Sequence, residues 1–278
     1  MATISLWNSI DKTNYQTLSM IAIATQMAVE HNLRILMIDA TFDDDTLEKS
    51  FWKMNPKTKS IMDQTGKLDI GSGAEGLISA VASNKCTPEI VPSYTRVVLK
   101  NRLDILCGLK TKIPEEYDRS MMLYKDLINT ASKYYDMVFV DLPKSLNKDY
   151  TKAILQNSHI ILYDMPQNLN NIDEYNKEKV SNSLLQGDKV IPLLSNVDQA
   201  SKYNEKNVAR YIQAKKGIAY VVHNTQFMEA CCEAGVVNYY LKTRSLRNNI
   251  NDKNYPFAQA VDTSCKLIIN KIKELHLA

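Results

Sequence analysis

Glycine is missing from the part of this sequence where a phosphate-binding protein would need it most. The 278 residues contain eight glycines, and none of them precedes Gly66. The opening residues nevertheless show the order strand, loop, helix, strand that surrounds a glycine-rich phosphate loop. Such a loop needs glycine because successive backbone N–H groups turn inward around phosphate oxygens, in conformations that side chains forbid. The absence therefore argues against a conventional phosphate cradle.

The segment that stands in place of the cradle carries acidic and bulky side chains. It runs Asn-Ser-Ile-Asp-Lys-Thr-Asn-Tyr-Gln-Thr over residues 8–17. A helix N-terminus favours anions, but here Asp11 would repel phosphate oxygens and Tyr15 would fill their space. We therefore expect no tight binding of a triphosphate by this segment.

Cysteine spacing, net charge and the length of apolar runs each argue against a further class of protein. The five cysteines include no C-x-x-C pair, which disfavours a zinc cluster or a disulfide scaffold and fits a reducing compartment. The formal net charge of +3 is too small to demand nucleic acid or an anionic membrane as a partner. No segment reaches the roughly 18 uninterrupted apolar residues of a membrane span. We expect a cytoplasmic protein, with peripheral attachment to the inner face of the membrane as the alternative.

What the sequence does contain is an alternation of apolar runs with amphipathic segments. Apolar runs predict strands at 3–7, 33–38, 103–108, 136–143, 159–164, 190–196 and 218–222, and helical spacing appears at 18–30, 77–82 and 123–133. Continuous apolar runs are typical of parallel strands buried on both faces. The pattern predicts an α/β fold with a doubly wound, mainly parallel sheet flanked by helices, in a single domain spanning 1–278. Residues 41–67 lack periodicity and predict a surface excursion with one short helix.

Two of these predicted strands end in aspartate, at Asp39 and Asp141. The carboxyl ends of parallel strands meet at one edge of a sheet, where enzymes of phosphoryl transfer use such an aspartate to hold magnesium. The alternative for each is a buried strand followed by a capping aspartate.

Five segments carry a resemblance to a known family because of their order along the chain. They are ISLW at 4–7, RILMIDA at 34–40, YDMVFVDLP at 135–143, SNVD at 195–198 and FMEACCEAG at 227–235. Over nearly the whole chain this order resembles the ParA/MinD group of SIMIBI-class P-loop ATPases, and within it the MinD-like proteins of pilus and secretion loci, including the TadZ type. The resemblance implies a P-loop NTPase-like, Rossmann-like fold of three layers.

The resemblance also assigns roles to residues near the N-terminus. Members of the family carry a loop of the form K-G-G-x-G-K-T, in which one lysine binds the β- and γ-phosphates and the earlier one reaches across a dimer interface. Neither lysine is clearly present here. Lys12 matches the earlier lysine in one register, and Thr13 or Thr17 would offer a hydroxyl to a metal. The alternative for Lys12 is an exposed loop lysine.

After the strands, one acid of the family's motif is lost, and two other site positions are kept. The family's D-x-D motif becomes Asp39-Ala40-Thr41, and Thr41 cannot act as a base. If the loop shifted, the acidic run at 43–45 would substitute for the lost acid. The alternative is that this run is a solvated turn. Asp141 keeps the metal-associated position, for Mg only if nucleotide binds, and Asn196 matches the family's adenine-contacting asparagine.

These remnants lead to a first hypothesis and an enzymatic alternative. The first is a pseudo-ATPase with no cofactor, which acts through protein partners as a scaffold for localisation, assembly or regulation. It would form a homodimer, or a heterodimer with an active ParA/MinD-like paralogue. The alternative is an atypical ATPase that binds ATP and Mg and uses Lys12 and the acids at 43–45.

Attachment to DNA or to a membrane surface is a third reading. For DNA the candidate patch is Lys242, Arg244 and Arg247 beside Tyr239 and Tyr240. For a membrane it is the apolar stripe of the C-terminal helix, although such a stripe more often packs on the sheet. The stripe consists of Val261, Cys265, Ile268, Ile272 and Leu275.

Overall fold

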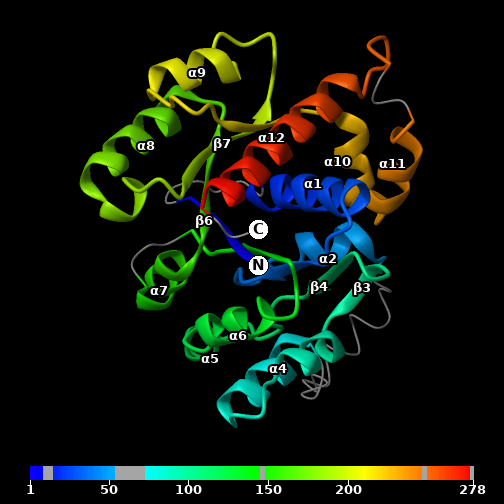
Figure 1. Ribbon diagram of the computed structural model, residues 1–278, viewed down its shortest axis with the longest axis vertical. Helices are drawn as coiled ribbons and strands as arrows, with labels where there is room; N and C mark the ends of the chain where they lie inside the picture. The colour runs from blue at the N-terminus through cyan, green and yellow to red at the C-terminus, as the bar shows by residue number, and fades with distance from the viewer. Residues whose placement is uncertain (9–14, 54–72, 145–147, 246–248, 276–278) are drawn as a thin grey trace.

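The seven apolar runs and one further strand form a sheet of eight strands in the computed structural model, which describes residues 1–8, 15–53, 73–144, 148–245 and 249–275. The strand order is β3-β4-β2-β5-β1-β6-β7-β8 (Figure 1). The strands are β1 (Ala2–Trp7), β2 (Ile35–Asp39), β3 (Arg96–Leu99), β4 (Leu103–Leu106), β5 (Met137–Asp141), β6 (Ile160–Pro166), β7 (Val190–Val197) and β8 (Ala219–Val222).

All strands run parallel to their neighbours except β3, which pairs antiparallel with β4 at one edge. The seven strands that the apolar runs predict are all present, and the mainly parallel, doubly wound sheet is confirmed. The sequence analysis missed β3 because this edge strand is partly exposed and so lacks a continuous apolar run.

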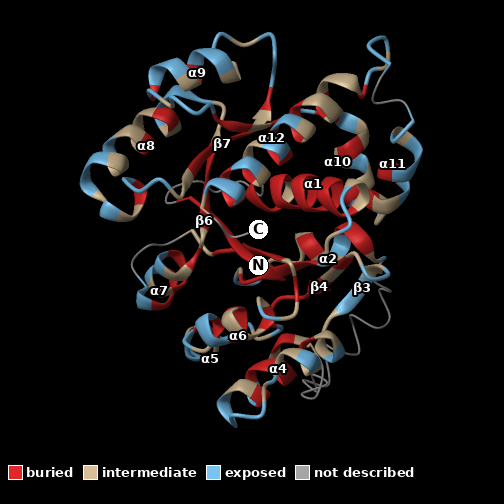
Figure 2. Cartoon of the chain, viewed as in Figure 1, coloured by how far each residue is buried: buried red, intermediate tan, exposed pale blue. Residues whose placement is uncertain are grey.

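Helices cover both faces of the sheet, which gives three layers (Figure 2). One face packs against α4 (Gly73–Ala82), α5 (Pro114–Met121), α6 (Tyr124–Ala131), α7 (Asp149–Asn157), α8 (Leu169–Ser181) and α9 (Glu205–Tyr211). The other packs against α1 (Tyr15–Glu30), α2 (Thr46–Phe51), α10 (Thr225–Cys232), α11 (Val236–Thr243) and α12 (Tyr255–Glu274). Short 3-10 helices lie at η1 (Pro88–Tyr94) and η2 (Ser183–Leu185).

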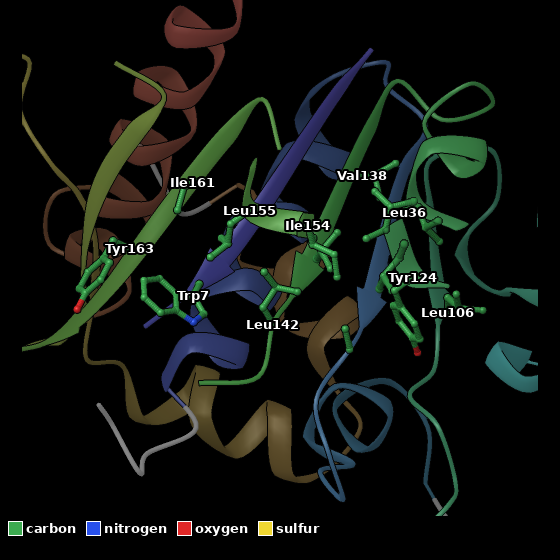
Figure 3. Packing of buried hydrophobic residues seen from close by; sticks show 14 of the residues in the cluster. Trp7, Leu36, Leu106, Tyr124, Val138, Leu142, Ile154, Leu155, Ile161 and Tyr163 are labelled. Atoms are coloured by element: carbon green, nitrogen blue, oxygen red, sulfur yellow. The ribbon is translucent and has the colours of Figure 1, made fainter. Parts of the chain in front are cut away.

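Two apolar clusters, one on each face, form the core. Figure 3 shows the cluster on the α6 and α7 side, where the Trp7 ring meets the Tyr163 ring edge-on at a centroid distance of 5.5 Å. The strands β1, β2 and β5 are buried along their whole length. Burial on both faces explains why these strands appear in the sequence as unbroken apolar runs rather than as alternating patterns.

The apolar stripe of α12 packs inward. Val261, Cys265, Ile268 and Ile272 are buried in the core cluster that α12 shares with α1, and Leu275 packs against it. The prediction that the stripe lies on the sheet side of the helix is therefore confirmed. Within the described ranges, no helix combines the length and the apolar character that crossing a membrane requires.

Candidate functional site

The carboxyl ends of β2 and β5 place two buried aspartates side by side beneath the start of α1. Asp39 and Asp141 are partners in the parallel register of these strands, and both are at most 3% exposed. Beside them opens a cleft of about 640 Å³ between the first turn of α1, the loop after β2 and the residues after β5. Its lining includes Gln16, Thr17, Thr41, Phe42, Asp43, Asp44, Asp45, Thr46, Lys49, Asp141, Leu142, Pro143 and Lys144.

Both carboxylate oxygens of Asp141 accept hydrogen bonds from the first turn of α1. Gln16 Nε2 donates to Oδ1 and Thr17 Oγ1 donates to Oδ2, each over 2.5 Å. Gln16 Nε2 also donates to the Leu142 carbonyl over 2.9 Å. Burial raises the pKa of Asp141 to about 6, against the lowering effect of the two hydrogen bonds. Asp141, which the resemblance associates with magnesium, is thus hydrogen-bonded on both oxygens by side chains of α1.

Asp39 is held by Thr41, where the resemblance leads one to expect a second acid. The Thr41 backbone N–H and the Thr41 hydroxyl both donate to Asp39 Oδ1, over 2.9 and 2.6 Å. Burial and then the negative charge of Asp141 raise the pKa of Asp39 to about 7, although the Thr41 bonds lower it. Thr41 therefore holds the Asp39 carboxyl group in place.

The loop after β2 adds negative charge to the cleft. Asp43 adopts a left-handed backbone conformation with φ of 51°, and Asp44 Oδ1 accepts a bond from the Thr46 backbone N–H over 2.8 Å. Asp45 pairs with Lys49 over 2.5 Å. The described lining contains four carboxylates and only two ammonium groups, a balance that opposes a polyphosphate.

Asn196 does not share this cleft with Asp141. It lies at the end of β7 with φ of 52°, and its Oδ1 lies 2.8 Å from His223 Nδ1. With Tyr15 and Leu18 of α1 it lines a separate, small cavity of about 20 Å³ toward α10.

Of the residues predicted for the site, the structure thus brings together Thr17, Asp39, Thr41 and Asp141. Lys12 and Thr13 lie outside the described residues.

Gln16 is the site residue whose role the sequence analysis did not recognise. The available signal was its place beside Thr17 at the start of a helix that follows a strand, opposite the strand-ending Asp141. Gln16 Oε1 is buried and has no hydrogen-bond partner among the residues that the structure describes, so this side chain presents one further acceptor at the cleft. Among the described residues, no three carboxylate, histidine or cysteine side chains are arranged to hold a metal ion.

The predicted DNA patch lacks its aromatic surface. Tyr239 and Tyr240 are buried at 8% and 4% exposure, and the Tyr240 hydroxyl donates to the Ala22 carbonyl over 2.8 Å. Arg244 pairs with Glu30 at 3.5 Å, and Arg247 lies outside the described residues. Buried rings cannot stack on bases, so the tyrosines do not serve nucleic-acid binding in this structure.

Comparison with solved structures identifies the fold. A ParA family ATPase from Chlorobium tepidum TLS superposes with a TM-score of 0.68 at 12% identity, covering 95% of this chain and 98% of its own. A Borrelia burgdorferi B31 protein assigned to plasmid partition, bound to AMPPNP, has a TM-score of 0.61 at 16% identity and covers 98% and 100%. The MinC:MinD cell division complex of Aquifex aeolicus gives 0.63 at 12% identity, with 97% and 96% covered.

No protein-family model matches the sequence. No curated protein matches it either. The chain thus has the P-loop fold of the ParA/MinD ATPases, as the sequence resemblance implies.

Proposed function

We propose that this protein is a catalytically degenerate ParA/MinD-like protein that acts as a localisation, assembly or regulatory scaffold through protein contacts. One observation carries the proposal. Both oxygens of Asp141 are engaged by side chains of the helix that would otherwise begin at a phosphate loop. A water molecule bound to magnesium would have to share the Asp141 oxygens with the Gln16 amide and the Thr17 hydroxyl.

The charges around the cleft support the same conclusion. Phosphoryl transfer depends on cations and N–H donors that neutralise the transferred group, and loss of one such donor lowers the rate by about 10²- to 10³-fold. Here the loop after β2 presents Asp43 and Asp44 to the cleft, and Thr41 stands where a second acid would act. Several catalytic elements are therefore replaced together, and we expect turnover to be abolished.

A protein without turnover would act through its surface. The Aquifex aeolicus MinD structure is a complex with MinC, so a protein of this fold can present a surface to a protein partner. We propose that the chain works as a homodimer or as the inactive partner of an active protein of the same fold.

Calorimetric titration tests the proposal. ATP with Mg is titrated into the intact chain, into Asp141→Ala and into Asp136→Ala. Asp136 immediately precedes β5, pairs with the exposed Arg34 at 3.6 Å and so serves as the matched control. We expect no saturable heat in any of the three proteins and no release of inorganic phosphate above background. Micromolar binding that is lost in Asp141→Ala and kept in Asp136→Ala would show that the proposal is wrong.

A second candidate function is an atypical ATPase in the positioning of DNA or of a surface machine. The observation in its favour is Gln16 Oε1, a buried oxygen that none of the described residues bonds, on a residue that lines the cleft beside Thr17. Oxygen atoms are the ligands that magnesium prefers. In this candidate Lys12 supplies the missing positive charge, so Lys12→Ala weakens ATP binding. In the scaffold proposal, Lys12→Ala changes nothing in the same titration.

A further inference from the structure

A second cavity of about 570 Å³ lies at the opposite edge of the sheet, where β7 begins. We call it the basal cavity. Its walls are α8, the residues from η2 into β7, the turn between α9 and β8, and the last turns of α12. It lies wholly in described parts of the chain and is lined by Tyr175, Lys179, Leu185, Gln186, Gly187, Asp188, Val190, Ile191, Pro192, Gln213, Ala214, Lys215, Lys216, Gly217, Leu267, Asn270, Lys271 and Glu274.

The volume and the lining suit a small molecule with an apolar body. Sites for small molecules commonly measure about 300–1,000 Å³ and combine an apolar wall with a few placed polar groups. Ile191 and Leu267 belong to the apolar cluster on the α12 side of the sheet and provide an apolar wall of the cavity, whereas Leu185 lines it from the cluster on the other face.

The turn between α9 and β8 gives the cavity a rigid backbone wall. Gln213 and Gly217 have φ of 55° and 85°, and the Gly217 N–H donates to the Ala214 carbonyl over 3.0 Å. A Cβ atom added at Gly217 would meet nothing within 4 Å, so the space beside the turn is open.

Positive charge exceeds negative charge in the basal cavity. Four lysines line it against two carboxylates, Asp188 and Glu274. Lys271 is only 6% exposed and forms an ion pair with Glu274 at 3.2 Å. Glu274 also pairs with Lys216, at 2.8 Å. One half-exposed carboxylate thus neutralises two ammonium groups, one of them buried. A buried ammonium group is destabilising unless it is fully paired, so an anion in the cavity would be stabilised here.

We propose that the basal cavity binds an amphipathic anion. The apolar body of the ligand lies against Ile191 and Leu267, and its carboxylate or phosphate group meets Lys271 and Lys216. This proposal is independent of the nucleotide cleft, because the two cavities lie at opposite edges of the sheet and share no lining residue.

Titration followed by backbone amide NMR signals tests the proposal with four probes: octanoate, hexyl phosphate, octanol and octylammonium. We expect the two anions to shift the signals of residues 213–217 and 267–274, and the anion that binds more tightly identifies the head group. The neutral alcohol and the cation should bind at least about tenfold more weakly, because a hydrogen bond between charged partners is stronger than one between neutral groups.

Lys271→Met keeps the aliphatic stem and removes the ammonium group. We expect it to weaken binding of the anion by about 10- to 100-fold. The matched control is Lys266→Met, because Lys266 lies on the same helix, is exposed and pairs with Asp262. Equal affinity for octanol and octanoate in the intact chain would overturn the proposal even if Lys271→Met failed to fold. So would the absence of shifts at 10 mM anion, or shifts confined to other regions.

Discussion

Gln16 bridges the end of β5 by donating from a single amide nitrogen to Asp141 Oδ1 and to the Leu142 carbonyl. This bridge joins the first turn of α1 to the edge of the sheet where β1, β2 and β5 end. Because Asp141 is buried, its ionised form depends on such donors for stability.

Gln16→Ala should therefore destabilise the fold, and more so at high pH. Removal of a donor to a buried charged group reduces the free energy of unfolding by about 1–3 kcal/mol. The loss should be largest at pH 8, where Asp141 is ionised, and smaller at pH 5, below its pKa of about 6. Urea denaturation at both pH values measures the difference. The control is Gln26→Ala, which removes a buried glutamine from the same helix. Its loss of unfolding free energy at pH 5 should equal its own loss at pH 8.

The intact chain should lose stability as the pH rises from about 4 toward 8. The pKa of Asp39 is raised to about 7 and that of Asp141 to about 6, from an ordinary value near 3.8. In this range the folded state binds more protons than the unfolded state, so the free energy of unfolding falls as pH rises through the folded-state pKa values.

Asp39→Asn should remove much of this pH dependence. An asparagine keeps an oxygen for the two Thr41 donors and carries no charge at any pH. We expect it to raise the free energy of unfolding at pH 8 by on the order of 2–4 kcal/mol, with little change at pH 4. Thermal or urea unfolding across pH 4–8 provides the measurement. An unchanged slope would contradict the buried, raised-pKa description of Asp39.

The sequence predicted the sheet well because strands that are buried on both faces consist of continuous apolar runs. It also placed Asp39 and Asp141 at one edge, because the ends of parallel strands meet there. It did not predict that Gln16 rather than a cation would contact Asp141, since that contact joins residues 125 positions apart. The basal cavity has no sequence motif either, because α8, α9 and α12 meet only in the folded chain.

Gly108 is required where the chain passes the Asp39 carboxylate. A Cβ atom at Gly108 would lie 2.8 Å from Asp39 Oδ2 and 2.9 Å from Asp39 Cγ. Gly108→Ala should therefore displace Asp39 and reduce stability by about 1–3 kcal/mol, as overpacking does. Gly187→Ala is the matched control, because the nearest atom to its new Cβ would be Lys189 Cγ at 3.9 Å. Equal urea midpoints for the two variants would show that Asp39 is not held as tightly as described.

The burial of the α12 stripe makes a prediction about membranes as well as stability. Ile268 is fully buried between α12, α1 and the sheet, so Ile268→Ala should reduce the free energy of unfolding by about 2–5 kcal/mol. The control is Lys266→Ala, which removes an exposed ion pair on the same helix. This change should alter the free energy of unfolding by about 0.5 kcal/mol or less.

Because the stripe is engaged in the core, the folded intact chain should also fail to float with liposomes. Two results together would show that the helix leaves the sheet to bind lipid. The unmodified chain would float with liposomes at a pH where it is folded, and Ile268→Ala would leave the free energy of unfolding unchanged.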